Sequence, residues 1–445
     1  MHTWYEQAVF YHIYPLGLLG AEKTNTLTET AHRLTELESW IPHISDLNGS
    51  AIYIGPLFES CTHGYDTKDF RLVDRRLGSN EDFARFVRLC HENGIRVVVD
   101  GVFNHTGREF FAFQDIREKR EASPYKDWYR GVNFGWGSPL GDPFGYEAWQ
   151  GHFELPCLNL WNPEVRQYLF DSIQFWIDNF NIDGIRLDCA NVLDFGFMKE
   201  LREKTSAMKP DFWLMGEVIH GEYNRWVNPE MLHSVTNYEL HKALYSGHND
   251  HNYFEIAHNV RRLEAVGRSL YTFVDNHDED RIASKLNNLA NLFSVYQLLF
   301  TLPGIPSVYY GSEWGIEGKR SRTSDEVLRP ALNLSDMHGK APELASHIAA
   351  LGKIHTENDA FHNGSYKELL LTNRQYAFSR SGEHGTVISA VNNDEQPASI
   401  SIPLPCAASD VVSLLPGEIP FSLENGRLSV TLPANGGAIF KLQEV

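Results

Sequence analysis

The sequence predicts an α/β fold, a (β/α)8 barrel, from three observations. Eight runs rich in β-branched and aromatic residues alternate with amphipathic, helix-like segments along most of the chain. These runs are nearly all apolar, which is typical of a parallel sheet that is buried on both faces. Short turns join the units, and eight such units in series point to a closed barrel. The predicted strands are residues 9–15, 51–57, 96–103, 182–188, 212–219, 235–240, 269–278 and 307–311.

The helical segments between these strands carry recognisable end signals. Ser79, followed three residues later by an aspartate, forms a capping box before the segment 83–92. Asn162-Pro163 places a cap residue before a proline in the first turn of the next helix, and Asn228-Pro229 repeats that arrangement. Both pairs therefore predict the start of a helix.

Two stretches break the alternating pattern. Residues 106–151 are too many for a simple strand-to-helix loop, are rich in Gly, Pro, Trp and Tyr, and predict a small inserted lobe. From about residue 366, short alternating runs separated by turn residues predict an antiparallel β domain. We therefore expect a barrel formed by residues 1–105 and 152–357, a lobe at 106–151 and a C-terminal β domain at 358–445.

Composition excludes several classes of partner. The 445 residues include 58 acidic and 39 basic side chains, and the formal net charge of -19 opposes binding to nucleic acid or anionic membranes. No apolar run approaches the roughly 20 residues needed to span a bilayer. Residues 1–20 lack the basic leader of a signal peptide. The expected location is the cytoplasm.

The five cysteines are an odd number and are widely spaced, without the spacing of zinc ligands. We expect free, buried thiols and no metal ion. Cys189 lies beside a candidate catalytic residue, but no histidine is suitably placed in the local sequence to activate it as a nucleophile.

Four predicted strands end in polar residues. The third ends with residues 100–105, the fourth with 184–188, the fifth with 216–218 and the seventh with 275–278. In a barrel the active site forms where the strands end, and this is where catalytic residues are expected. Gathering several ionisable groups at one mouth costs folding free energy, which a function must offset.

Two of these carboxyls have unlike surroundings. Arg186 and Asp188 are two residues apart on one strand, so both side chains point to the same face, and the arginine would keep the aspartate ionised. Glu217 follows an apolar run, which would hold its proton. An ionised carboxylate and a protonated carboxyl can divide the roles of nucleophile and acid.

The segments DGVFNH, GIRLDCAN, GEVI and FVDNHD, in this order, resemble the four motif regions of the α-amylase family of glycoside hydrolases. The resemblance covers the whole chain, because the family also has a barrel, a lobe after the third strand and a C-terminal β-sandwich. It implies a retaining α-glucoside hydrolase that acts on α-1,4 or α-1,6 linked glucose oligomers, such as maltodextrins or cyclodextrins.

The resemblance also implies roles for individual residues. Asp188 matches the nucleophile, Glu217 the general acid and base, and Asp278 the carboxylate that stabilises the transition state. The expected outcome is retention, with nucleophile and acid about 5 Å apart. The residues expected to bind the sugar or hold the nucleophile are His63, Tyr65, His105, Arg186, Asn191 and His277. The expected partner is an α-glucan oligosaccharide.

Residues 155–159 and Asn191 resemble the neopullulanase and cyclomaltodextrinase branch of the family. The chain departs from that branch at Val192, where glutamate is usual, and at Ile219, where tryptophan is usual. Asn104 matches a position that binds calcium in many secreted members, and we interpret it as structural, so no cofactor is expected. We expect a monomer or a weak homo-oligomer.

Two alternatives remain at this point. A sugar hydroxyl in place of water would make a transglycosylase or an isomerase from the same covalent intermediate. A barrel of this fold could also bind a carbohydrate or a protein without catalysis, since fold does not fix function. The presence of all three acids argues against the second alternative.

Overall fold

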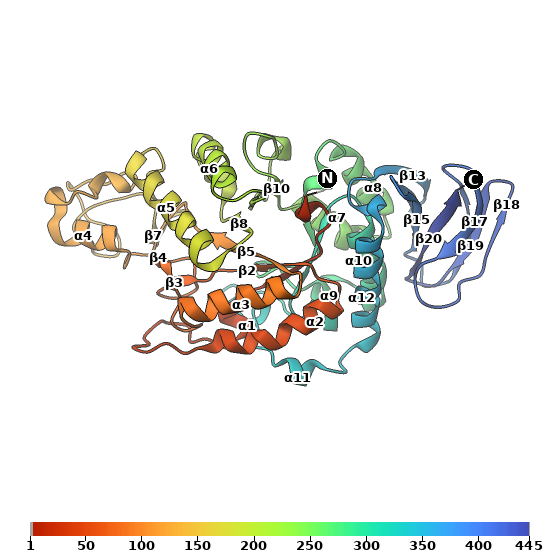
Figure 1. Ribbon diagram of the computed structural model, residues 1–445, viewed down its shortest axis with the longest axis horizontal. Coiled ribbons are helices and arrows are strands. Elements are labelled where there is room, and N and C mark those ends of the chain that lie inside the picture. The colour runs from red at the N-terminus through yellow and green to blue at the C-terminus, as the bar shows by residue number, and fades with distance from the viewer. Residues whose placement is uncertain (1–2, 445) are drawn as a thin grey trace.

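The computed structural model describes residues 3–444 and contains the predicted barrel (Figure 1). Eight parallel strands form one sheet in the order β10-β9-β8-β5-β2-β1-β12-β11. A parallel bridge between Thr236 and Tyr271 joins the two edges, which closes the sheet. The strands are β1 (Phe10–Ile13), β2 (Ala51–Ile54), β5 (Arg96–Gly101), β8 (Gly184–Leu187), β9 (Trp213–Gly216), β10 (Ser234–Val235), β11 (Tyr271–Phe273) and β12 (Ile305–Tyr309).

Helices surround the barrel and pack against its strands or against one another. The longer ones are α2 (Trp40–Asp46), α3 (Asn80–Glu92), α5 (Pro163–Phe180), α6 (Phe195–Met208), α7 (Tyr238–Asn249), α8 (Tyr253–Arg262), α10 (Leu292–Thr301) and α12 (Pro342–Glu357). Three short helices, α1 (Pro15–Leu18), α9 (Ile282–Lys285) and α11 (Leu334–Met337), lie in connecting loops. Among residues 3–444, no helix is both long and apolar enough to cross a membrane.

The predicted helix starts were confirmed in two places and wrong in one. The hydroxyl of Ser79 accepts from the backbone N–H of Asp82 at 3.2 Å, and the Asp82 carboxylate accepts from the N–H of Ser79, so the capping box begins α3. The side chain of Asn162 caps α5, with Pro163 at its first position. Asn228 only closes a turn by accepting from the N–H of Glu230 at 3.0 Å, and no helix follows.

The sixth predicted strand was partly wrong. Residues 234–235 form β10, but the chain then turns at Asn237, whose side chain accepts from the N–H of Leu240 at 3.0 Å and caps α7. The apolar run 235–240 therefore contains a strand end and a helix start. Periodicity alone cannot separate the two in so short a run.

The barrel interior is filled by apolar side chains and is a packed core. The indole of Trp213 is fully buried and stacks on the ring of Phe10, with the ring centroids 4.9 Å apart. Tyr53, Val98 and Phe273 belong to the same cluster. This plug of side chains below the mouth supports the residues that the strands carry at their carboxyl ends.

The segment after β5 contains a helix, α4 (Phe111–Lys119), and a hairpin of β6 (Ala148–Trp149) and β7 (His152–Pro156). Together with the hairpin of β3 (Phe58–Ser60) and β4 (Thr67–Val73), it adjoins the barrel mouth. A bridge between His105 and Cys157 ties the chain directly after β7 back to the segment that follows β5. Helix α4 and the C-terminal strands lie at opposite ends of the long axis (Figure 1).

The C-terminal region is an antiparallel β-sandwich, as expected. One sheet has the order β13-β14-β15-β20-β17 and the other has the order β16-β19-β18. The two sheets enclose an apolar cluster of their own, which includes Ile388, Val430 and Phe440. The strands are β13 (Ser365–Leu371), β14 (Gln375–Gly382), β15 (Gly385–Asn392), β16 (Ala398–Pro403), β17 (Ala408–Ser413), β18 (Phe421–Glu424), β19 (Arg427–Leu432) and β20 (Gly437–Glu444).

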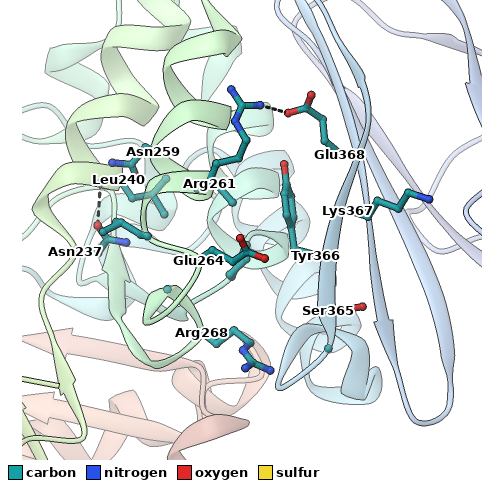
Figure 2. A pocket seen from close by; sticks show the side chains of 15 residues that line it. Asn237, Leu240, Asn259, Arg261, Glu264, Arg268, Ser365, Tyr366, Lys367 and Glu368 are labelled. Carbon is teal, nitrogen blue, oxygen red and sulfur yellow. Dashed lines mark hydrogen bonds and ion pairs between the residues drawn. The ribbon is translucent and has the colours of Figure 1, made fainter. Parts of the chain in front are cut away.

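Polar contacts join the sandwich to the barrel helices. The fully buried amide of Gln297 on α10 donates to the hydroxyl of Ser389 at 3.0 Å and to the carbonyls of Ala390 and Ala438 at 3.1 Å each. Further along the junction, a cavity of about 400 Å³ lies between α8 and β13, where Arg261 and Glu368 form an ion pair (Figure 2). One part of the junction is thus held by buried hydrogen bonds, and another part contains a cavity.

The five cysteines are free thiols, as predicted, but the expectation that all of them are buried was wrong for two. Cys90, Cys157 and Cys189 are buried, and Cys61 and Cys406 are partly exposed.

Candidate active site

The strand ends bring the predicted acids together at one mouth of the barrel. Asp100 lies on β5, Asp188 directly follows β8, and Glu217 directly follows β9. These are neighbouring strands of the sheet, and all three side chains are buried. Asp278 follows β11 and is partly exposed, with 37% of its side chain accessible. The arrangement agrees with the expectation that polar strand ends converge.

Arg186 lies at the centre of this group. Its guanidinium donates to Asp188 Oδ1 at 2.8 Å and to Asp100 Oδ1 at 3.1 Å, and it lies 3.0 Å from Glu217 Oε2. Only 4% of the arginine side chain is exposed. A buried charge of this kind is tolerated because three carboxyls surround it, and in turn it fixes their oxygens.

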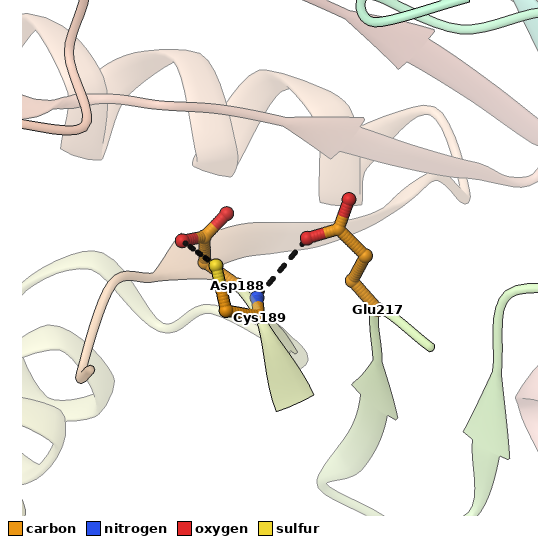
Figure 3. A group of neighbouring side chains, drawn as sticks. All are labelled: Asp188, Cys189 and Glu217. Atoms are coloured by element: carbon orange, nitrogen blue, oxygen red, sulfur yellow. Dashed lines mark hydrogen bonds between the residues drawn. The ribbon is translucent and has the colours of Figure 1, made fainter. Parts of the chain in front are cut away.

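Cys189 contacts two of the three predicted catalytic residues, Asp188 and Glu217 (Figure 3). Its backbone N–H donates to Glu217 Oε2 at 3.0 Å, and its thiol donates to Asp188 Oδ2 at 3.1 Å. The thiol and one oxygen of each carboxyl lie within 4.8 Å of one another. A nucleophilic role for Cys189, which the sequence disfavoured, also lacks support here, because burial raises the pKa of this thiol well above its ordinary value and keeps it protonated.

Glu217 has the electrostatic setting of an acid catalyst. Burial raises its pKa from 4.5 to about 7, and the nearby charges of Asp188 and Asp278 add to this, while Arg186 opposes it. A carboxyl with this pKa is protonated in much of the population near neutral pH.

Asp278 has the opposite setting. Burial alone would raise its pKa, but the charges of His277 and Arg329 outweigh that effect and hold the pKa below the ordinary value. Arg329 donates to Asp278 Oδ1 at 2.7 Å, and His277 Nε2 lies 3.0 Å from Asp278 Oδ2. Asp278 is therefore an ionised carboxylate at neutral pH.

Tyr65 forms one wall of the mouth. Its hydroxyl lies 2.5 Å from His277 Nε2 and donates to Asp100 Oδ2 at 3.3 Å. The rings of Tyr65 and His277 stack with centroids 5.7 Å apart and planes inclined by 17°. An aromatic face in this place can pack against the apolar face of a sugar ring.

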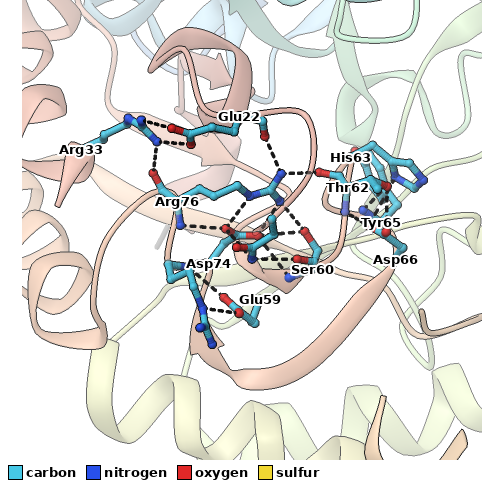
Figure 4. A network of polar contacts seen from close by, with 12 residues as sticks. Glu22, Arg33, Glu59, Ser60, Thr62, His63, Tyr65, Asp66, Asp74 and Arg76 are labelled. Carbon is cyan, nitrogen blue, oxygen red and sulfur yellow. Dashed lines mark hydrogen bonds and ion pairs between the residues drawn. The ribbon is translucent and has the colours of Figure 1, made fainter. Parts of the chain in front are cut away.

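A buried ion pair holds the loop that carries Tyr65 (Figure 4). Arg76 donates to both carboxylate oxygens of Asp74, at 2.9 and 2.7 Å, and also to the carbonyl of Thr62 and the hydroxyl of Ser60. Thr62 in turn donates to Asp66, next to Tyr65. The wall of the mouth is thus anchored to β3 and β4.

The remaining predicted binding residues lie in different settings. His105 is buried, and its Nε2 has no hydrogen-bond partner among the described residues, so it can donate to or accept from a bound molecule. The ring of His63 is partly exposed, and its Nδ1 accepts from the N–H of Tyr65 at 3.2 Å. Asn191 is exposed on the 3-10 turn Ala190–Val192, and no hydrogen bond joins it to the acids within residues 3–444.

Three aromatic residues of the lobe also lie in different settings: near the mouth, in the core of the lobe and at its surface. The ring of Trp149 lies 5.8 Å from that of His105, close to the mouth. Tyr146 is buried, and its hydroxyl donates to Asp142, so it belongs to the core of the lobe. Trp136 is 65% exposed.

Sequence reasoning missed Arg329 and gave Asp100 no role. Arg329 follows the 3-10 turn Glu326–Leu328, beyond the last barrel strand, and also donates to the carbonyl of His277 at 2.9 Å. No strand-end signal marks it. Asp100 lies in one of the polar strand ends noted in the sequence. Only the structure shows that its carboxylate accepts hydrogen bonds from Arg186, Tyr53 and Tyr65.

The ligand atoms of Asp188, Cys189 and Glu217 lie close enough together for a metal ion. However, Arg186 lies within 3.0 Å of both carboxylates and the thiol donates to one of them, so these atoms already satisfy one another. Asn104, the position related to calcium binding, donates through its amide to His105 Nδ1 at 3.1 Å. We assign no metal to either place.

A barrel mouth with an ionised carboxylate, a carboxyl of raised pKa and a third carboxylate defines the class of glycoside hydrolases. A family model described as "Alpha amylase, catalytic domain" matches residues 25–338. The chain belongs to the α-amylase family, near its cyclomaltodextrinase and neopullulanase members.

Individual relatives resemble most of the chain. A cyclomaltodextrinase of Geobacillus thermopakistaniensis is 30% identical over 470 residues, which cover 99% of this chain and 78% of that protein. Neopullulanase 2 of Thermoactinomyces vulgaris is 28% identical over 472 residues, covering 98% and 78%. The crystal structure of Ttha1563 from Thermus thermophilus superposes with a TM-score of 0.85 at 30% identity, covering 99% and 100%. A non-catalytic barrel is therefore set aside.

Proposed function

We propose that this protein is a retaining α-glucan hydrolase that cuts α-1,4 or α-1,6 linked glucose oligomers, such as maltodextrins or cyclodextrins. One observation carries the proposal: an oxygen of Asp188 and an oxygen of Glu217 lie within 4.8 Å of each other. Retaining glycosidases separate the two carboxyl groups by about 5 Å, whereas inverting ones leave room for a water molecule between them.

In the first step Asp188 is the nucleophile. One of its carboxylate oxygens forms a bond to the anomeric carbon as the bond to the leaving sugar breaks, and Glu217 gives its proton to the leaving oxygen. The raised pKa of Glu217 supports this role, because the proton is present near neutral pH. The product of this step is a covalent glucosyl ester.

In the second step Glu217, now ionised, takes a proton from water as the water oxygen attacks the anomeric carbon. The bond between that carbon and the Asp188 oxygen breaks, which restores the Asp188 carboxylate. Asp278 stays ionised and stabilises the positive charge that develops on the sugar in both transition states. Tyr65, His105 and His277 line the same mouth and would contact the sugar beside the bond that is cut. Arg186 holds Asp188 in place through a hydrogen bond to its Oδ1.

The names of the relatives support the substrate class. The similar proteins described above include a cyclomaltodextrinase and a neopullulanase. Residues 155–159 of this chain resemble the extra motif of that branch of the family. Val192 and Ile219 differ from the usual residues of that branch, and both side chains are exposed. Substitutions at these two positions can therefore alter the preference among cyclic, linear and branched substrates.

The test is product analysis with and without the proposed nucleophile. The protein and its Asp188→Asn variant are incubated with maltotriose, a cyclodextrin, pullulan, isomaltose and soluble starch, and products are followed by chromatography. We expect cleavage by the parent only, with products that first appear as the α-anomer by NMR. Cleavage by both proteins, or first release of the β-anomer, would refute the mechanism. Longer oligomers at high maltose concentration would reveal transglycosylation.

A further inference from the structure

Cys189 contacts both of the carboxyls to which the proposed function assigns the covalent chemistry. We propose that its thiol is a positioning group that sets the orientation and basicity of Asp188, while its backbone N–H holds Glu217 in place. The inference rests on the proposed function, since it concerns the same reaction. It assigns a role to a side chain that the mechanism above does not use.

The backbone of Cys189 makes the double contact possible. Its φ of 50° lies in the left-handed region, which is unfavourable for a residue with a Cβ atom. Such a conformation persists where the surroundings fix it, and it often occurs at functional sites. Here it aims the N–H at Glu217 Oε2, at 3.0 Å, while the thiol reaches Asp188 Oδ2, at 3.1 Å.

The thiol is the donor in its contact with Asp188. Burial raises the pKa of Cys189, and the negative charges of Asp188 and Glu217 raise it further, so the proton stays on sulfur. Asp188 therefore has two unlike donors: the guanidinium of Arg186 on Oδ1 and the thiol on Oδ2. A thiol is a weaker donor than a hydroxyl or an N–H group.

A weak donor suits an oxygen that has to react. A hydrogen bond to a carboxylate stabilises its charge and lowers its pKa, and the same stabilisation opposes the transfer of an electron pair to the sugar carbon. When the ester forms, the negative charge leaves the carboxylate, the leaving oxygen takes the proton of Glu217, and the thiol keeps its own proton. The thiol thus orients Oδ2 at little cost in nucleophilicity.

Other charged groups face Asp188 and set the background for a titration. They are Arg186, which contacts it, and Asp100, His105 and Glu217, which interact with it through their charges. None of them is altered by a substitution at position 189. A shift in the ionisation of Asp188 in such a variant therefore reports the loss or strengthening of the contact with the side chain of Cys189.

The test compares Cys189→Ser and Cys189→Ala with the parent by the pH dependence of kcat/KM on a maltooligosaccharide. Serine supplies a stronger donor, so the acid limb should move down by about half a pH unit, and glycosylation should slow about threefold to tenfold. Alanine supplies no donor, so the acid limb should move up by a similar amount. Cys90→Ser and Cys90→Ala alter a buried thiol on α3, away from the mouth, and should leave the acid limb in place.

A second readout does not depend on turnover. The S–H stretching band of Cys189, assigned by the infrared difference between the parent and Cys189→Ala, should lie below the frequency of a free thiol. A band at the free-thiol frequency, or identical acid limbs in folded and active Ser, Ala and parent proteins, would overturn the inference. Full activity of Asp188→Asn would instead overturn the proposed function, and the infrared band would still report on the thiol contact.

Discussion

The carboxyls at the mouth differ in the groups that touch them, and this difference determines how the protein should respond to pH. Glu217 has a pKa of about 7, whereas that of Asp278 lies below its ordinary value. A single buried guanidinium contacts Asp188 and Glu217, but burial still favours the neutral form of Glu217. Identical side-chain chemistry thus yields two protonation states within one site.

The first prediction concerns the alkaline limb of the pH profile. Because Glu217 must be protonated in the free enzyme, kcat/KM should fall tenfold per pH unit above about pH 7. Glu217→Gln should lose about 10²- to 10⁴-fold on maltooligosaccharides but much less in glycosylation by α-glucosyl fluoride, whose leaving group needs no acid. Steady-state and single-turnover rates from pH 5 to 9 measure both effects. An equal loss on both substrates would contradict the role of acid.

The second prediction concerns stability. The pKa of Glu217 is raised on folding from 4.5 to about 7, so the native state binds more protons than the unfolded state between these values, and stability falls as pH rises through this range. The free energy of unfolding of Glu217→Gln, relative to the parent, should therefore improve by about 2 kcal/mol between pH 5 and pH 8. Urea unfolding at the two pH values measures it. A difference that does not change with pH would show that Glu217 is not buried with its proton.

Most of the proposed site residues could be predicted because they end apolar strands. Asp188, Glu217 and Asp278 stand where a buried run meets a polar segment, a signal that one sequence can carry. Arg329 could not be predicted in this way, because it lies in a loop 51 residues after Asp278 in the sequence and contacts that carboxylate only in the folded protein. Only the folded chain brings such partners together.

At the scale of elements, the strand-and-turn unit of β3 and β4 acts as the support of the mouth. Asp74 and Arg76 are two residues apart at the end of β4, and each side chain is 1% exposed. Their contacts reach back to Ser60 and Thr62, so the loop with Tyr65 cannot shift without breaking them. A buried pair of this kind fixes a conformation more than it adds stability.

The third prediction tests this support. Arg76→Met should destabilise the protein by about 3–5 kcal/mol, because it leaves Asp74 buried without its partner, and should raise KM through the loosened Tyr65 loop. Arg85→Met is the matched control, since its pair with Glu38 is partly exposed, does not contact Arg76 and should cost at most about 1 kcal/mol. Thermal unfolding and maltooligosaccharide kinetics measure both. Similar losses in the two variants would contradict the anchoring role.

Elements with strong periodicity or clear caps were predictable, and weakly patterned ones were not. The long run of α5 and its cap at Asn162 were recognised. The strands β17 and β18 have mostly exposed side chains without a regular alternation, so their bounds could not be predicted. The end of β10 was placed wrongly because the polar cap of α7 lies inside an apolar run. The sequence shows a clear helix or strand pattern only where one face of the element is buried and the other is exposed.

At the scale of the molecule, the sandwich is bonded to the barrel helices through buried groups. We propose domain boundaries at residues 1–105 with 152–357, 106–151 and 358–445; the separate apolar cluster of the C-terminal strands supports the last of these. Gln297 joins two of the units, because its amide reaches the β15 and β20 strands. The barrel and the sandwich should therefore unfold together.

The fourth prediction follows from this junction. Gln297→Ala should lower the free energy of unfolding by about 2–4 kcal/mol, because two strand carbonyls lose their donor in a buried place. We expect one transition in the parent by calorimetry and a lower midpoint in the variant, with catalysis unchanged at low temperature. A parent that unfolds in two well-separated steps would contradict the coupling of the two units.

The plug of apolar side chains inside the barrel has a consequence for the history of the protein. The groups that keep the strands together, such as Trp213 and Phe10, lie below the mouth, and the exposed side chains of Val192 and Ile219 lie on the loops above it. Mutations in these loops can accumulate without breaking the scaffold. Substrate preference can therefore diverge between descendants that inherit the same barrel almost intact.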